Sequence, residues 1–143
     1  MSMARLSAQA WAALGGTLVL LAACASGQKP AAPITDREWV LAALGDRTAP
    51  TGAGNRPATL RFDSATSRAS GFAGCNRYSA TYTLAANTLR FGPAVSTKMA
   101  CAEGDELERS FLAIFPAVAG YEATDSVLTL DGQSGPLARF HSR

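Results

Sequence analysis

Histidine is almost absent from this sequence of 143 residues, because His141, close to its end, is the only one. A cysteine nucleophile needs an imidazole or an equivalent base beside it, and we expect His141 to be solvated at the end of a strand. The sequence motifs of serine hydrolases, phosphate-binding loops and zinc proteases are also missing. We therefore expect no catalytic residue, no cofactor and no enzymatic activity.

Cysteine is scarce too, with three in the chain and no pair in the C-x-x-C spacing of many zinc sites. Together with one histidine, these residues fall short of a closed zinc shell. The carboxylates of Asp105, Glu106 and Glu108 are close in sequence, but their pattern is that of a helix start. We predict no metal site.

Clusters of one charge are missing as well. The chain has 13 basic and 11 acidic residues, for a formal net charge of +2, and its arginines are scattered singly. Nucleic-acid-binding proteins gather basic residues into a patch or stripe. We therefore expect a solvated surface of mixed charge and no nucleic-acid partner.

The first 24 residues have the pattern of a bacterial lipoprotein signal. No charge occurs from Ala10 to Cys24, and an apolar core of about 13 residues is too short for a membrane span, which needs roughly 20. The run ends in Leu21-Ala22-Ala23-Cys24, which resembles the cleavage site at which the cysteine sulfur takes a diacylglycerol. The alternative is a buried N-terminal helix, but Gly15 and Gly16 interrupt the run and no polar face accompanies it. We predict a signal peptide over residues 1–23 and lipidation of Cys24.

The mature chain would then consist of a tether and one domain. Residues 24–36 are rich in small residues and proline, with too little bulk to form a core, and are predicted to be flexible. Residues 37–143 are enough for one core. Ala25 stands where an aspartate often retains lipoproteins in the inner membrane. We expect a monomer in the cell envelope, held by its lipid in the outer membrane and facing the periplasm.

Hydrophobic periodicity predicts an α+β fold. Short strands separated by turn residues dominate, as in the alternation of Tyr78, Ala80 and Tyr82 with polar neighbours. One helix begins at Asp105, where Asp105 and Glu108 have the form of a capping box, and Pro116 should end it near Phe115. We expect a curved, mostly antiparallel and partly barrel-like sheet covered by a single helix. The Gly- and Pro-rich segment 45–57 is predicted to be a long loop.

Once Cys24 is assigned to lipid, Cys75 and Cys101 remain as an even pair in an exported domain. A disulfide is the first expectation. A redox-active pair stays open as an alternative, and it needs an exposed cysteine of low pKa.

Six stretches of the sequence resemble the META domain, also called the HslJ-like domain. They begin with Trp39 and end with a Leu-rich pair of strands, and the most specific of them contain G-C-N and T-x-M-A-C. The stretches are Trp39, 59–62, 70–82, 89–101, 108–111 and 128–140. The resemblance covers about residues 37–141.

The resemblance identifies Gly71, Gly74, Asn76 and Thr97, together with the two cysteines, as signature residues. In this interpretation Gly71 and Gly74 adopt unusual backbone angles, Asn76 makes a cap or turn, and Cys75 and Cys101 form the bridge. The family has no established enzymatic activity or ligand, and its namesake is a heat-inducible protein associated with novobiocin resistance.

These observations predict a non-catalytic envelope lipoprotein that acts in envelope maintenance or in stress and antibiotic tolerance. The alternative is a periplasmic inhibitor or ligand-binding module whose segment 45–57 meets a cell-envelope protein partner.

Overall fold

The computed structural model of the protein describes residues 32–143. The predicted signal peptide, the lipidation site Cys24 and most of the predicted tether lie outside the described residues. Between residues 32 and 143, no helix is long and apolar enough to cross a lipid bilayer.

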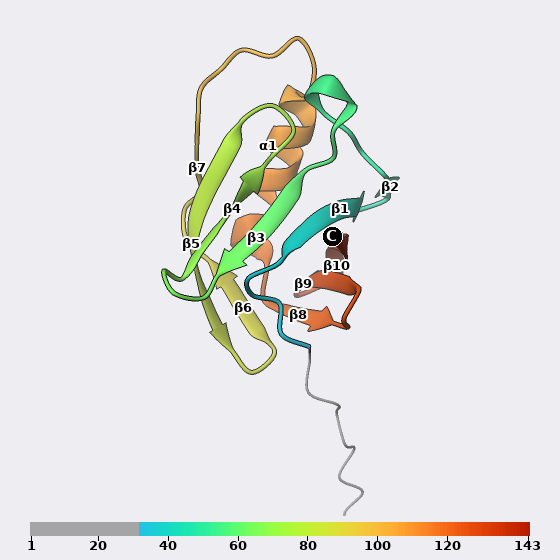
Figure 1. The fold of residues 1–143 in the computed structure, drawn as a ribbon. Helices are drawn as coiled ribbons and strands as arrows, with labels where there is room; N and C mark the ends of the chain where they lie inside the picture. Colours follow the sequence, from blue (N-terminus) through green and yellow to red (C-terminus); the bar gives the residue numbers. More distant parts are fainter. Residues whose placement is uncertain (1–31) are drawn as a thin grey trace, which may run out of the picture.

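Ten strands form one sheet that curves into a nearly closed barrel (Figure 1). The strand order is β6-β5-β4-β3-β1-β10-β9-β8, while β2 pairs with β1 and β7 pairs with β5. All of these strand pairings are antiparallel. The strands are β1 (Glu38–Leu44), β2 (Arg47–Thr48), β3 (Thr59–Asp63), β4 (Arg68–Phe72), β5 (Arg77–Ala85), β6 (Thr88–Phe91), β7 (Val95–Ser96), β8 (Gly120–Ala123), β9 (Val127–Gly132) and β10 (Gly135–Ser142).

Hydrogen bonds between the region of β8 and that of β6 bring the two ends of this strand order together. The backbone N–H of Tyr121 donates to the carbonyl of Asn87 over 3.1 Å, and the Tyr121 hydroxyl donates to the carbonyl of Ala86. The Arg90 guanidinium donates to the carbonyl of Val118. The expected α+β class, with a curved, partly barrel-like antiparallel sheet and one helix, is confirmed.

Alternation along the strands explains which face is buried. In β3, Leu60 and Phe62 are fully buried whereas Arg61 between them is exposed. In β5, Tyr78 and Ala80 point to the same buried side. Because successive strand residues point to opposite faces, the inner face holds the core and the outer face holds the polar side chains.

Helix α1 (Asp105–Ala113) packs on the inner face of the sheet (Figure 1). Leu107 and Phe111 are its buried residues, and the ring of Phe111 meets the ring of Tyr78 edge to face, with centroids 5.6 Å apart. The α-helix ends before Pro116, which lies in a short 3-10 turn, η2 (Phe115–Ala117). Proline lacks a backbone N–H and cannot continue the helix, as the sequence predicted.

The predicted capping box is wrong. Gly104, with φ of 99°, is the N-cap residue and makes no side-chain cap, so Asp105 is already the first helical residue. The Glu108 carboxylate does not reach back to the start of the helix but accepts a hydrogen bond from the backbone N–H of Asn76 at 2.6 Å. The Glu108 carboxylate therefore binds the backbone of Asn76 instead of capping the helix.

The predicted boundary between tether and domain at residue 37 is also wrong. Ile34 is only 1% exposed and belongs to the core, and its carbonyl accepts a hydrogen bond from the indole N–H of Trp39 at 2.9 Å. The N–H of Asp36 donates to the carbonyl of Phe62 at 2.7 Å. One bulky side chain, Ile34, is enough to dock this segment, and the domain therefore includes residues 34–36.

Candidate functional site

A tight turn between β4 and β5 carries three of the predicted signature residues. The N–H of Ala73 donates to the carbonyl of Asn76 at 2.8 Å, and Gly74 has a φ of 127°, which side-chain-bearing residues rarely adopt. Cys75 forms a disulfide with Cys101, with Cα atoms 5.9 Å apart. The turn is therefore covalently joined to the segment that precedes helix α1.

Asn76 binds that same segment through its side chain. Its Oδ1 accepts hydrogen bonds from the Thr97 hydroxyl at 3.0 Å and from the N–H of Met99 at 2.9 Å. Its Nδ2 donates to the carbonyl of Met99 at 3.3 Å. Asn76 is only 5% exposed, so these bonds satisfy a polar side chain that would otherwise be costly to bury.

Glu108 completes this network from helix α1. Its carboxylate accepts the backbone N–H of Asn76 at 2.6 Å and lies 3.4 Å from Nδ2 of the same residue. Hydrogen bonds to an ionised acceptor are roughly twice as strong as those between neutral groups. Asn76, Thr97, Met99 and Glu108 together with the disulfide form what we call the signature clamp, which joins the β4–β5 turn, segment 97–101 and the helix.

Three glycines allow a further loop to join the signature clamp. The N–H of Ala53, in the short 3-10 turn η1 (Ala53–Asn55), donates to the carbonyl of Gly74 at 2.7 Å. A Cβ at Gly52 or at Gly104 would collide with that same carbonyl group. The predicted loop 45–57 is therefore fastened to the clamp at its middle by close backbone packing.

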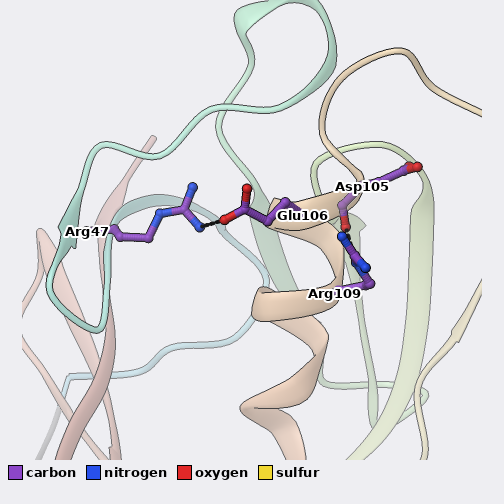
Figure 2. A network of polar contacts seen from close by, with 4 residues as sticks. All are labelled: Arg47, Asp105, Glu106 and Arg109. Atoms are coloured by element: carbon purple, nitrogen blue, oxygen red, sulfur yellow. Dashed lines mark hydrogen bonds and ion pairs between the residues drawn. The ribbon is translucent and has the colours of Figure 1, made fainter.

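An ion pair holds the same loop to the helix (Figure 2). Arg47 in β2 contacts Glu106 in the first turn of α1 at 3.0 Å, and Arg109 donates to the backbone carbonyl of Asp105 at 3.3 Å. Both side chains of the ion pair are largely exposed, at 48% and 75%. Exposed ion pairs contribute about 0–1 kcal/mol, so the glycine packing and the hydrogen bonds matter more for the position of the loop.

Gly71 serves close packing and not an unusual backbone angle, which corrects the sequence-based expectation for this residue. Its φ is not positive, but a Cβ would collide with the carbonyl of Thr59 on the neighbouring strand. Tyr78 lies opposite Gly71 in the register, and its hydroxyl donates to the carbonyl of Thr59 at 2.9 Å. The Tyr78 side chain thus crosses β4 over the glycine, and burial raises the pKa of Tyr78 well above its usual value.

The residues considered for catalysis or metal binding are arranged as follows. Ligand atoms of Cys75, Cys101 and Asp105 lie within 4.8 Å of one another. Metals bind the thiolate form of cysteine, and in this structure both sulfurs belong to the disulfide. His141 is exposed on β10 and, within residues 32–143, makes no side-chain hydrogen bond to Cys75.

Two features of this region had no signal that pattern reasoning could use. The Glu108 carboxylate matches a helix cap, and only the fold shows that it accepts from Asn76 instead. Gly52 lies among several glycines of one loop, and nothing in their spacing distinguishes the one that packs against Gly74.

The fold and the signature clamp define a small α+β domain in which one disulfide-linked turn fastens the loops and the helix to a nearly closed barrel. The chain belongs to the META domain family, whose family model matches residues 32–143.

Solved structures agree with this assignment. An NMR structure of a protein from Burkholderia xenovorans is 30% identical with a TM-score of 0.63, and the match covers 83% of this chain and 93% of that one. A second NMR structure, 23% identical with a TM-score of 0.58 over 75% of this chain and 90% of that one, shares the fold. No curated protein matches the sequence.

Proposed function

We propose that the protein is a non-catalytic lipoprotein of the bacterial envelope that acts in envelope maintenance or in stress and antibiotic tolerance. One observation carries the proposal: the domain that follows a lipoprotein-like leader contains a disulfide between Cys75 and Cys101. Disulfides persist in oxidising compartments and are rare in the cytosol. Export of the domain is the simplest explanation for both the leader and the disulfide.

The roles of the signature residues support a non-catalytic function. The polar groups of Asn76, Thr97 and Glu108 form hydrogen bonds with one another and with the backbone. Cys75 is oxidised in the disulfide. A nucleophile or general base must keep a reactive group available to a substrate. The clamp residues have the partners of a structural network.

In this proposal Cys24 carries the lipid that holds the protein, as a monomer, at the outer membrane facing the periplasm. Two or three acyl chains provide the two anchoring signals that stable attachment requires. The membrane is then the first partner of the protein, and the domain acts next to it.

Deletion of the gene followed by complementation tests this proposal. We expect deletion to sensitise the cells to heat or novobiocin and the wild-type gene to restore tolerance, whereas Cys24→Ala should fail to restore it because the anchor is lost. Ser26→Ala, two residues further on, is the matched control and should restore tolerance fully. Full tolerance in the deletion strain, or full rescue by Cys24→Ala, would contradict the proposal.

A second candidate is a periplasmic inhibitor or ligand-binding module. It is favoured by one observation, namely that loop 45–57 is fastened at Gly52 and paired through Arg47, as a binding loop on a rigid support would be. Capture of envelope proteins by the intact lipoprotein distinguishes the two candidates. An enzyme bound in one-to-one ratio and inhibited would favour this candidate, and no such enzyme together with sensitivity on deletion would favour maintenance.

A further inference from the structure

The outer face of the sheet gathers arginines that are far apart in the sequence. They occupy alternate, exposed positions on neighbouring strands and directly after β10, so they share one face. These residues are Arg61, Arg68, Arg77, Arg139 and Arg143. By contrast, seven of the 11 acidic residues lie between positions 103 and 131, where Arg109 is the only basic residue. Glu38 and Asp63 lie on this face too, opposite Arg61 and Arg68 in the register, so the face is mixed in charge with an excess of arginine.

A groove of about 180 Å³ opens on the same face, where loop 45–57 returns to β3. Its lining combines apolar and basic side chains from four strands and the loop with one acidic side chain, Glu38, which pairs with Arg143. These include Val40, Thr59 and Phe72 on the sheet and Arg56, Arg77 and Arg143 around them.

Phe72 forms the apolar centre of the groove. Although it is only 8% exposed, it does not belong to the core cluster inside the barrel, because its position in β4 points outward. The guanidinium carbon of Arg56 lies 4.1 Å from the centroid of its ring. Arg77 is its direct neighbour across the β4–β5 pairing and lines the same groove.

The charges of these two arginines are not neutralised within residues 32–143. Arg143 is paired with Glu38 at 3.2 Å, but neither Arg56 nor Arg77 makes an ion pair with a carboxylate of this part of the chain. In the described part of the chain, Arg56 makes one side-chain hydrogen bond, a long one from Nε to the carbonyl of Ala53 at 3.4 Å. Most of the guanidinium N–H groups of Arg56 and Arg77 therefore have no partner among residues 32–143 and can bind an anion.

We propose that this groove binds a phosphate monoester, with the phosphate between Arg56 and Arg77 and the apolar part of the ligand on Phe72 and Val40. A phosphate monoester carries close to two negative charges at neutral pH, which matches two unpaired guanidinium groups. The planar fork of arginine suits the oxygens of phosphate. Concave sites with apolar walls and a few polar groups are typical of small-molecule binding.

This binding site goes beyond the proposed envelope role and does not depend on it. The sheet and the signature clamp hold it in place, since Arg77 begins β5 directly after Asn76 and Arg56 ends the loop fastened at Gly52. The clamp then has a purpose beyond stability, because it positions the backbone that carries the two arginines.

Calorimetric titration of the complete chain, in a non-ionic detergent and at low salt, tests the proposal with phenyl phosphate as the probe. We expect saturable binding at one site that is tighter than the binding of inorganic phosphate, and no binding of uncharged benzyl alcohol. Arg56→Gln and Arg77→Gln should each weaken binding about tenfold, as expected for the loss of one charge-assisted contact. No saturable binding of phenyl phosphate would overturn the proposal.

Arg68→Gln is the matched control, because Arg68 is exposed on the same face but donates to Ser79 outside the groove. It should leave the affinity unchanged, and an equal loss in all three variants would overturn the proposed site by showing a general charge effect. Vesicles containing phosphatidic acid distinguish the two sources of such a phosphate. Vesicle binding that phenyl phosphate displaces assigns the site to a lipid headgroup, and phenyl phosphate binding without vesicle binding assigns it to a soluble monoester.

Discussion

Replacing Asn76 by alanine removes the centre of the signature clamp. The variant loses three contacts of the side-chain amide with segment 97–101: the bond from the Thr97 hydroxyl at 3.0 Å and the two to the backbone of Met99 at 2.9 and 3.3 Å. A typical intramolecular hydrogen bond contributes about 0.5–1.5 kcal/mol. We therefore expect Asn76→Ala to lower the free energy of unfolding by about 2–4 kcal/mol.

Solvent keeps this value from being larger. Met99 is 64% exposed as a whole residue, and its hydrogen bonds with Asn76 are only partly buried, so water replaces part of the lost bonding and the full penalty for unsatisfied buried groups does not apply. Natural domains of this size have a total stability of about 5–15 kcal/mol, so the variant should still fold.

Urea unfolding followed by circular dichroism measures the effect. With an m-value of about 1.5 kcal/mol/M, a loss of 3 kcal/mol shifts the midpoint by about 2 M. Asn87→Ala is the matched control, because Asn87 is exposed in a turn and its side chain makes no hydrogen bond within residues 32–143. The control should stay within about 0.5 kcal/mol of the wild type. The same small change in Asn76→Ala would refute the assignment of the clamp as a stabilising network.

Asn76→Asp separates the role of charge from that of shape. In this variant a carboxylate replaces the side-chain amide of Asn76. One of its oxygens takes the place of Nδ2, which lies 3.4 Å from Oε1 of Glu108. Two carboxylates this close repel each other until one is protonated. We expect Asn76→Asp to recover stability, relative to Asn76→Ala, as the pH falls from 7 to about 4, and parallel pH profiles of the two variants would contradict this.

Three further predictions concern other parts of the domain. Reduction of the disulfide, which links residues 26 apart in sequence, should lower the free energy of unfolding by about 3.5 kcal/mol in denaturant titrations; rapid reaction of both cysteines in the folded protein with mild reductants would instead revive the redox alternative. Gly71→Ala should cost about 1–3 kcal/mol, because its Cβ would collide with a backbone carbonyl, while Ser70→Ala serves as the outward-facing control; equal melting curves would be inconsistent with the close packing. Hydrogen bonds from Ser64 lower the pKa of Asp36, so the stabilisation by Asp36 is present above its unfolded-state pKa and is lost as the pH falls through its folded-state pKa. Ser64→Ala should raise that pKa in an NMR titration, and an unchanged pKa would exclude Ser64 as its cause.

Much of the fold could be predicted because local periodicity determines which face of each element is buried. Leu60 and Phe62 alternate with Arg61, and Tyr78 with its neighbours, so these strands could be recognised without knowing their partners. The four-and-three spacing from Leu107 to Phe111 to Ile114 likewise indicates one apolar helix face. Pro116 limits the length of the helix, because proline has no backbone N–H to donate and its ring clashes with the carbonyl four residues earlier.

The features that could not be predicted depend on contacts between segments that are distant in sequence. Glu108 lies 32 residues from Asn76, and no local pattern shows that its carboxylate serves this partner instead of a cap. The arginines of the outer face come together only through the order of β10, β1, β3, β4 and β5. In the sequence Ile34 is an isolated apolar residue, so no local pattern assigns it to a core. In the fold it only has to add one side chain to a core that Trp39 and the strands already form.

Whether this META domain is exported, lipidated and oxidised can be read from the intact mass of the protein purified from its own cells. We expect a polypeptide that begins at Cys24, carries the added mass of two or three acyl chains, and has no free thiol. A polypeptide of all 143 residues with three reduced cysteines and no lipid would contradict it.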